Sequence, residues 1–236
     1  MSTASRFANP IFCAIDRQDA AGAVDLARSL AGVVGGVKLG LEYFVANGPA
    51  GVREVAGTGL PIFLDLKLHD IPNTVAGAVR SACRLQPAIL TLHAAGGRAM
   101  LEAAVEAAGD AATWLVGITV LTSLDDADLA AQGIAGTATD HVLRMAELAA
   151  ASGLHGVVCS PHEIAPLRRH FGRDLRLVVP GIRAPGDATG DQKRTLPAAE
   201  AVALGAHVLV VGRPITRASE PSAAAAALVR SLPEAA

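Results

Sequence analysis

The chain has 236 residues, of which 51% are hydrophobic and 18% are charged, and its formal net charge is -2. This length suits one large α/β domain or two small ones, and the apolar fraction is ample for a closed core. Without a basic stripe or an acidic tail, the chain is not expected to bind nucleic acid. Without an apolar run of about 18–20 residues, it is not expected to span a membrane.

The predicted strands are short, nearly continuous apolar runs, which are typical of parallel strands covered on both faces. They are residues 10–15, 36–39, 61–66, 88–93, 114–119, 156–159, 175–179 and 207–211. Longer stretches rich in Ala and Leu alternate with them and predict helices at residues 20–31, 74–85, 98–108, 140–151, 161–171 and 221–232. Eight such units without a linker predict an α/β fold, a (β/α)8 TIM barrel that forms a single domain over residues 1–236.

An open, doubly wound sheet is the alternative fold, but no Gly-x-Gly-x-x-Gly motif follows the first predicted strand. In a barrel, the chemistry lies at the C-terminal ends of the strands, so polar residues at those ends are candidates for a site. In chain order they are Asp16, Lys38, Asp65 with Lys67 and Asp70, His93, Thr122 with Ser123, Ser160, Pro180 to Arg183, and Gly212 with Arg213.

The segment after the third predicted strand, residues 65–74, reads Asp-Leu-Lys-Leu-His-Asp-Ile-Pro-Asn-Thr. Strand side chains alternate between faces, so its leucines are expected to face the helices while Asp65 and Lys67 point into the barrel mouth. Charges buried there need partners. A structural salt bridge is the alternative interpretation of a single Asp-Lys pair, but Asp-x-Lys-x-x-Asp with Lys38 nearby favours a functional site. Asn73 and Thr74 can cap the helix that follows.

The chain resembles the orotidine 5'-monophosphate decarboxylase family over nearly its whole length. The matching blocks are Ala14-Ile15-Asp16, Val37-Lys38-Leu39-Gly40, the string from Asp65 to Thr74, Leu121-Thr122-Ser123, Pro180-Gly181-Ile182-Arg183, Gly190-Asp191-Gln192-Lys193-Arg194 and Val211-Gly212-Arg213-Pro214-Ile215-Thr216. The string from Asp65 to Thr74 is highly specific, and no motif position departs from the family's pattern. The resemblance implies conversion of orotidine 5'-monophosphate to UMP and carbon dioxide, the last step of de novo UMP biosynthesis, without a cofactor or a metal.

The resemblance also implies a catalytic array of Lys38, Asp65, Lys67 and Asp70, in which Asp70 reaches into the neighbouring subunit's site. A lysine between carboxylates is held protonated, which suits a proton donor and not an imine former. Loss of carbon dioxide leaves a carbanion at C6 in the plane of the pyrimidine, and no thiamin or pyridoxal motif is evident to accept its electrons. We expect Lys67 to stabilise and protonate this carbanion. Asp65 would face the substrate carboxylate, either repelling it or positioning Lys67.

The expected substrate-binding residues lie at or just beyond the ends of the predicted strands. They are Asp16, Lys38, Asp65, Leu66, Lys67, Leu68, His69, Asp70, Ile71, Pro72, Asn73, Thr74, Thr122, Ser123, Pro180, Arg183, Gln192, Gly212 and Arg213. Loops after the seventh and eighth strands commonly bind phosphate, and a guanidinium such as that of Arg213 suits a phosphate dianion. A solvated rim position is the alternative for any one arginine.

Within this set, the resemblance assigns Arg183 and Gln192 to the phosphate side, with Gln192 also reaching the base. It assigns Thr122 and Ser123 to the pyrimidine amide edge and ribose, although such a pair could instead cap a helix. Asp16 and Lys38 are expected at the ribose hydroxyls. His69 has a backbone hydrogen bond as its alternative role, and the histidines share no spacing typical of metal ligands.

The resemblance further implies a homodimer in which Asp70 and Thr74 cross the interface. Two other functions remain open. One is a magnesium-dependent decarboxylase or aldolase acting on a sugar phosphate, although such enzymes usually carry a Glu where Lys38 stands. The other is a nucleotide-binding barrel without activity, which would not need the complete charged set.

The three cysteines, Cys13, Cys83 and Cys159, lie far apart in apolar surroundings and form no Cys-x-x-Cys pair. We expect buried, reduced thiols, which are typical of a reducing compartment. The first nine residues contain no apolar run of the length found in signal peptides. Both observations favour a cytoplasmic location.

Overall fold

The computed structural model describes residues 6–182 and 195–233, and its strands form one closed barrel. The strands are β1 (Ile11–Ile15), β2 (Gly36–Gly40), β3 (Ile62–Leu68), β4 (Ile89–His93), β5 (Trp114–Ile118), β6 (Gly156–Val158), β7 (Arg176–Val179) and β8 (Val208–Val211). Each strand is parallel to its neighbours in sequence order, and β8 closes the ring by pairing with β1, where Leu209 lies opposite Ile11. The predicted (β/α)8 barrel is confirmed, and the open sheet is excluded.

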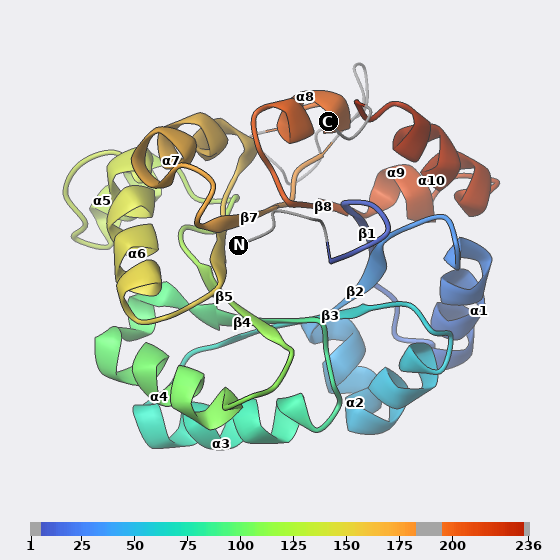
Figure 1. Cartoon of the computed structure of the whole chain (residues 1–236), viewed down its shortest axis with the longest axis horizontal. Helices are drawn as coiled ribbons and strands as arrows, with labels where there is room; N and C mark the ends of the chain where they lie inside the picture. Colours follow the sequence, from blue (N-terminus) through green and yellow to red (C-terminus); the bar gives the residue numbers. More distant parts are fainter. Residues whose placement is uncertain (1–5, 183–194, 234–236) are drawn as a thin grey trace.

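Helices surround the barrel on its outside (Figure 1). They are α1 (Ala20–Leu30), α2 (Leu41–Ala56), α3 (Pro72–Cys83), α4 (Arg98–Ala108), α5 (Asp126–Ala131), α6 (Ala138–Ala151), α7 (Ile164–Phe171), α8 (Ala198–Ala203), α9 (Arg213–Thr216) and α10 (Pro221–Arg230), with 3-10 turns at Ala94–Gly96 and Pro161–Glu163. In the described part of the chain, no helix has both the length and the apolar composition needed to cross a membrane.

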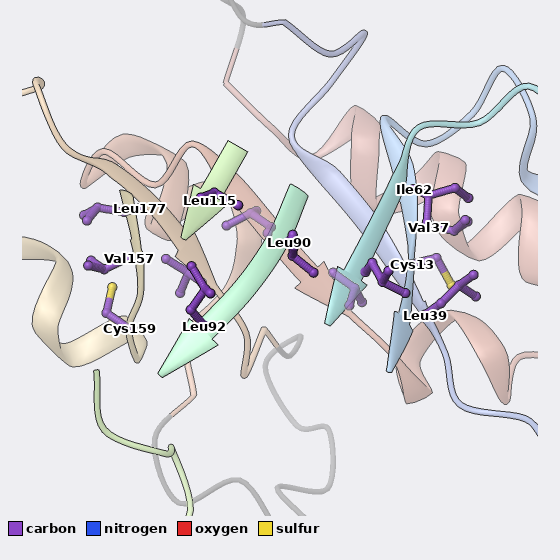
Figure 2. Close-up of a cluster of buried hydrophobic side chains, with 14 of the residues drawn as sticks. Cys13, Val37, Leu39, Ile62, Leu90, Leu92, Leu115, Val157, Cys159 and Leu177 are labelled. Atoms are coloured by element: carbon purple, nitrogen blue, oxygen red, sulfur yellow. The ribbon is translucent and has the colours of Figure 1, made fainter. Parts of the chain in front are cut away.

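Two layers of apolar side chains hold the fold together, because successive strand residues point to opposite faces. The outer layer fills the space between strands and helices, and Figure 2 shows part of it, including Val37, Leu90 and Leu177. The inner layer fills the barrel itself with Phe12, Phe63, Ile89, Val116, Val178 and Val208. Each of these inner side chains is at most 1% exposed, so the lower barrel is a packed core and not a pore.

Aromatic side chains close the N-terminal end of the barrel. The Phe7 ring packs edge-on against Phe12 at 4.9 Å and against Trp114 at 5.1 Å between ring centroids. The guanidinium of Arg176 lies 4.5 Å from the centroid of the Trp114 ring. Aromatic pairs of this kind contribute about 0.5–1.5 kcal/mol each beyond their burial. This end is therefore built for stability, which leaves the opposite end for a site.

None of the three cysteines forms a disulfide, as expected, but they are not equally buried. Cys13 and Cys159 are buried, whereas Cys83 on α3 is only partly so. Burial, together with the negative charge of Asp16, raises the pKa of Cys13 to about 12. The expectation of burial is therefore correct for two of the three thiols.

Candidate active site

A cavity of about 650 Å³ opens at the C-terminal ends of the strands. Its floor is apolar and comes from the top of the inner core, with Ala14, Phe63, Ile118, Val158 and Val210. Its charged lining residues are Asp16, Lys38, Glu42, Asp65, Lys67, Arg213 and Arg217. Small-molecule sites are commonly of this size and combine an apolar body with a few placed polar groups.

Asp65 is the centre of the charged array. Its Oδ2 lies 2.7 Å from Lys67 Nζ and 3.6 Å from Lys38 Nζ, and Lys38 Nζ lies 3.5 Å from Asp16 Oδ1. The side chains of Asp65 and Lys38 are 11% and 12% exposed, whereas that of Lys67 is 29% exposed and faces the cavity. The predicted grouping of Lys38, Asp65 and Lys67 is therefore present within one chain.

The carboxyl group of Asp65 stays ionised despite its burial. Desolvation alone would raise its pKa, but the charges of Lys38 and Lys67 outweigh that effect, and hydrogen bonds from Lys67 and Thr91 add to them. The pKa of Asp65 consequently lies below its ordinary value. A stable negative charge thus stands at the cavity wall with a lysine ammonium on either side.

The alternation predicted for the third strand is confirmed. Leu64 belongs to the outer apolar layer and Leu66 and Leu68 pack against it, while Asp65 and Lys67 line the cavity. The ladder to β4 is irregular here, since Leu64 pairs with Leu90 but Leu68 pairs with Leu92. This irregularity was not predicted.

Beyond Lys67, the predicted segment leaves the cavity. Asp70 is exposed, and its Oδ1 accepts a hydrogen bond of 2.6 Å from the N–H of Ile71. The helix begins at Pro72 with Ile71 at its N-cap and without a side-chain cap, so the expected cap from Asn73 or Thr74 is wrong. A proline in the first turn supplies the helical φ angle and has no N–H that needs a cap.

Two histidines stack beside the array. The rings of His69 and His93 lie 5.2 Å apart and nearly parallel, at 28°. Burial lowers the pKa of His93, and the charges of His69 and Lys67 lower it further. His69 itself is exposed and does not line the cavity.

The other wall of the cavity comes from the ends of β5, β7 and β8. Of the residues expected there, the lining includes Thr122, Pro180, Gly212 and Arg213, but Ser123 is exposed and lies outside it. The predicted phosphate-side residues Arg183 and Gln192 lie outside the described residues.

Sequence reasoning missed several residues of the site. Glu42, Thr216 and Arg217 line the cavity, and Thr91 contacts the array from β4. Glu42 and Arg217 follow the ends of β2 and β8 by a few residues, so a search that extended further beyond the strand ends would have included them. Thr91 lies inside an apolar strand, where no sequence signal distinguishes it from a core residue.

Comparisons with known proteins identify the family of this chain. Residues 9–228 match the family model described as "Orotidine 5'-phosphate decarboxylase / HUMPS family". An orotidine 5'-phosphate decarboxylase of Paramagnetospirillum magneticum is 54% identical over 92% of this chain and 95% of its own. That of Novosphingobium aromaticivorans is also 54% identical, over 95% of this chain and 99% of its own. The crystal structure of orotidine 5'-phosphate decarboxylase from Lactobacillus acidophilus superposes with a TM-score of 0.83 at 34% identity, covering 94% of this chain and 98% of that chain.

Proposed function

The chain belongs to the orotidine 5'-phosphate decarboxylase/HUMPS family, and from this we infer that it is the carboxy-lyase that converts orotidine 5'-monophosphate to UMP and carbon dioxide. This reaction is the last step of UMP biosynthesis. Relatives that carry the decarboxylase name are 54% identical over more than nine-tenths of the chain, which supports this activity over that of a sugar-phosphate enzyme. The catalytic roles below extend this activity to individual residues.

The observation that carries the mechanism is the 2.7 Å contact of Lys67 Nζ with Asp65 Oδ2 at the cavity wall. The bond between C6 and the carboxylate breaks, carbon dioxide leaves, and the electron pair stays on C6. The ammonium of Lys67 stabilises this charge and then donates its proton to C6. Two opposite unit charges about 4 Å apart attract by ~4 kcal/mol at an effective dielectric of about 20, so a fixed ammonium can stabilise the carbanion substantially.

Asp65 faces the substrate carboxylate in this scheme. Its ionised state supports two roles, which are repulsion of the substrate carboxylate and positioning of Lys67. Asp16 and Lys38 hold the ribose hydroxyls. Their carboxylate and ammonium groups lie 3.5 Å apart at the cavity edge, within reach of neighbouring hydroxyls.

We assign the remaining binding roles by the same resemblance. Arg213 and Gly212 take the phosphate together with Arg183 and Gln192, while Thr122 and Ser123 contact the pyrimidine. The guanidinium of Arg213 lies at the start of α9 and at the cavity wall, which suits a phosphate dianion. Pro180 lines the same wall.

Replacement of Lys67 by alanine tests the mechanism. We expect turnover to fall at least about 1000-fold, because the variant lacks both the electrostatic stabilisation and the proton donor. UMP binding by calorimetry should persist, since the phosphate and base contacts remain. Arg80→Ala, which removes an exposed cation on α3, is the matched control and should retain full activity. Turnover near the wild-type rate in Lys67→Ala would exclude the assignment.

Two simple assays separate the alternative functions. A fall in absorbance when orotidine 5'-monophosphate is added reports UMP formation, which an inactive nucleotide-binding barrel would not give. Activity that survives EDTA separates this enzyme from a magnesium-dependent sugar-phosphate enzyme. The ammonium of Lys38, 3.6 Å from the Asp65 carboxylate, supports the metal-free alternative, because it already supplies a cation there.

We further propose a homodimer in which Asp70 and Thr74 reach the partner's site. Within the described residues, no cation pairs with Asp70, which leaves its charge available to a second chain. Three exposed apolar side chains follow β2 and β3 in the chain. They are Leu41 and Val45 on α2 and Ile71 before α3, at 50%, 81% and 67% exposure. Apolar surface of this kind marks protein interfaces.

We also propose that the chain forms one catalytic domain in the cytoplasm. The family match from residue 9 to residue 228 supports the first part of this proposal, and the three cysteines, which form no disulfide, support the second. Recovery of the activity in the cytosolic fraction of lysed cells is the expected result. Recovery in a periplasmic or membrane fraction would contradict it.

A further inference from the structure

Thr91 lies in the middle of β4, where an apolar side chain would be ordinary. It is completely buried, and it shares the inward face of the strand with Ile89, while Leu90 and Leu92 join the outer layer. A buried hydroxyl needs hydrogen-bond partners to offset its lost hydration. Both partners of Thr91 belong to the charged array of β3.

The hydrogen bonds of Thr91 have fixed directions. The backbone N–H of Lys67 donates to Thr91 Oγ1 at 2.9 Å, and Thr91 Oγ1 donates to Asp65 Oδ1 at 2.9 Å. A hydroxyl has only one proton, and a backbone amide can only donate, so the Thr91 proton is directed to the carboxylate. One side chain thus fixes the carboxylate of Asp65 and the main chain of Lys67 together.

The backbone of Lys67 explains why such a support is needed. Its φ angle is +51°, in the left-handed region that side chains other than glycine rarely adopt. The residue also lies between Leu64 and Leu68, where the register between β3 and β4 shifts. Its N–H therefore bonds to the Thr91 hydroxyl. The same bulge directs Lys67 towards the cavity.

We propose that Thr91 is a positioning residue for decarboxylation, which holds the Lys67 bulge and the Asp65 carboxylate in the geometry that the reaction requires. The inference rests on the roles proposed for Lys67 and Asp65. Thr91 acts through these two residues, since it is completely buried beneath them and is absent from the cavity lining. It should therefore affect the chemical step more than the binding of the substrate.

The test compares Thr91→Val with Thr91→Ser. Valine keeps the shape but removes both hydrogen bonds, so kcat should fall roughly 10- to 100-fold, the effect of losing a hydrogen bond to a charged group. KM and the affinity for UMP should stay within about threefold, because the phosphate and base contacts are untouched. Serine keeps the hydroxyl and should restore most of kcat.

Thr113→Val is the matched control. Thr113 is also a buried threonine, but its hydroxyl donates to the carbonyl of Pro87 at 2.8 Å, just before β5 and away from the cavity. The control loses the buried hydrogen bond to Pro87 and should keep the wild-type kcat. If Thr91→Val does not fold, Thr91→Cys replaces it, because a thiol is similar in size and a weaker donor. A kcat between those of the serine variant and an inactive enzyme is then expected.

Each result has a distinct meaning. A Thr91→Val enzyme with wild-type kcat, or a serine variant as slow as valine, overturns the inference while Lys67→Ala remains inactive. A wild-type kcat in Thr91→Cys has the same meaning. If Lys67→Ala is itself active, the proposed mechanism fails, whatever the Thr91 variants do.

Discussion

His155 and His207 stabilise the N-terminal end of the barrel in the same way. Nδ1 of His155 accepts a hydrogen bond from the N–H of Leu115 at 3.2 Å, and Nδ1 of His207 accepts one from the N–H of Leu177 at 3.1 Å. Each histidine directly precedes one strand, and its ring accepts the hydrogen bond of the backbone N–H of the second residue of the neighbouring strand. An imidazole nitrogen can accept only when it is unprotonated, so both contacts require neutral rings.

The pKa of His207 makes this contact dependent on pH. Burial lowers the pKa to about 4, and the positive charges of Arg168, Arg176 and Arg173 contribute. The folded-state pKa lies below the unfolded value, so the stabilisation is complete above about pH 6.5 and is lost as the pH falls towards 4. Because His207 is partly exposed to screening solvent, we expect it to account for a loss on the order of 2 kcal/mol in the free energy of unfolding across this window.

Urea denaturation of His207→Asn at several pH values checks this prediction. Asparagine can accept the same hydrogen bond without titrating, so its stability should change less between pH 6.5 and pH 4. His162→Asn, which alters an exposed histidine, should keep the wild-type dependence. If the free energy of unfolding depended on pH equally in wild type and His207→Asn, other groups would be the cause of the lost stability.

At the scale of elements, close approach between β6 and β7 depends on a glycine. A Cβ atom on Gly156 would lie 2.3 Å from the carbonyl oxygen of Arg176, its partner in the parallel ladder. Backbone atoms cannot move aside as the end of a flexible side chain can. The two strands would therefore have to separate to admit any larger residue.

Gly156→Ala is expected to lower the free energy of unfolding by about 1–3 kcal/mol, the usual effect of overpacking. Gly77→Ala is the control, for which we expect the free energy of unfolding to rise. Gly77 lies within α3, where a Cβ would lie 3.9 Å from the guanidinium of Arg80, and alanine should stabilise the helix by about 0.5–1 kcal/mol. Thermal unfolding of both variants measures the difference. A Gly156→Ala protein as stable as the wild type would show that the strands separate freely.

The elements differ in how far the sequence could predict them. Strands were predictable because parallel strands are apolar on both faces, and every strand was located. The helix α2 was not predicted, because Gly48 and Pro49 interrupt its pattern, and Gly48 indeed has a non-helical φ of 59°. The helix α8 was missed because it has only six residues.

Some features of the candidate site could likewise be predicted from the sequence, and others could not. Lys38, Asp65 and Lys67 could be predicted because charged residues at the ends of apolar strands are conspicuous. The left-handed backbone of Lys67 and its bond to Thr91 could not, because they arise from the register between β3 and β4. The residue pattern of a single strand does not report how that strand is aligned with its neighbour across a bulge.

At the scale of the whole molecule, the proposed dimer predicts shared sites. A mixed dimer of one Lys67→Ala chain and one Asp70→Asn chain has one site with both defects and one with neither. Each variant alone should be nearly inactive, whereas the mixed dimer should regain about half of the wild-type activity per dimer, as two-fold symmetry requires.

Two different affinity tags allow the mixed dimer to be purified. A dimer of two differently tagged Lys67→Ala chains is the control and should stay inactive. If each site were complete within one chain, the mixed dimer would contain no intact site. Its inactivity would then contradict the proposed sharing of Asp70.

The packed lower half of the barrel makes the reaction chamber blind at one end. Phe63 and Val210 form its floor, Phe12 and Val208 fill the barrel below them, and Phe7 seals the base. Each of these side chains is at most 7% exposed, so the stack obstructs a path through the barrel. We therefore expect carbon dioxide to leave through the same opening by which the nucleotide enters. Bound UMP would then restrict the release of carbon dioxide.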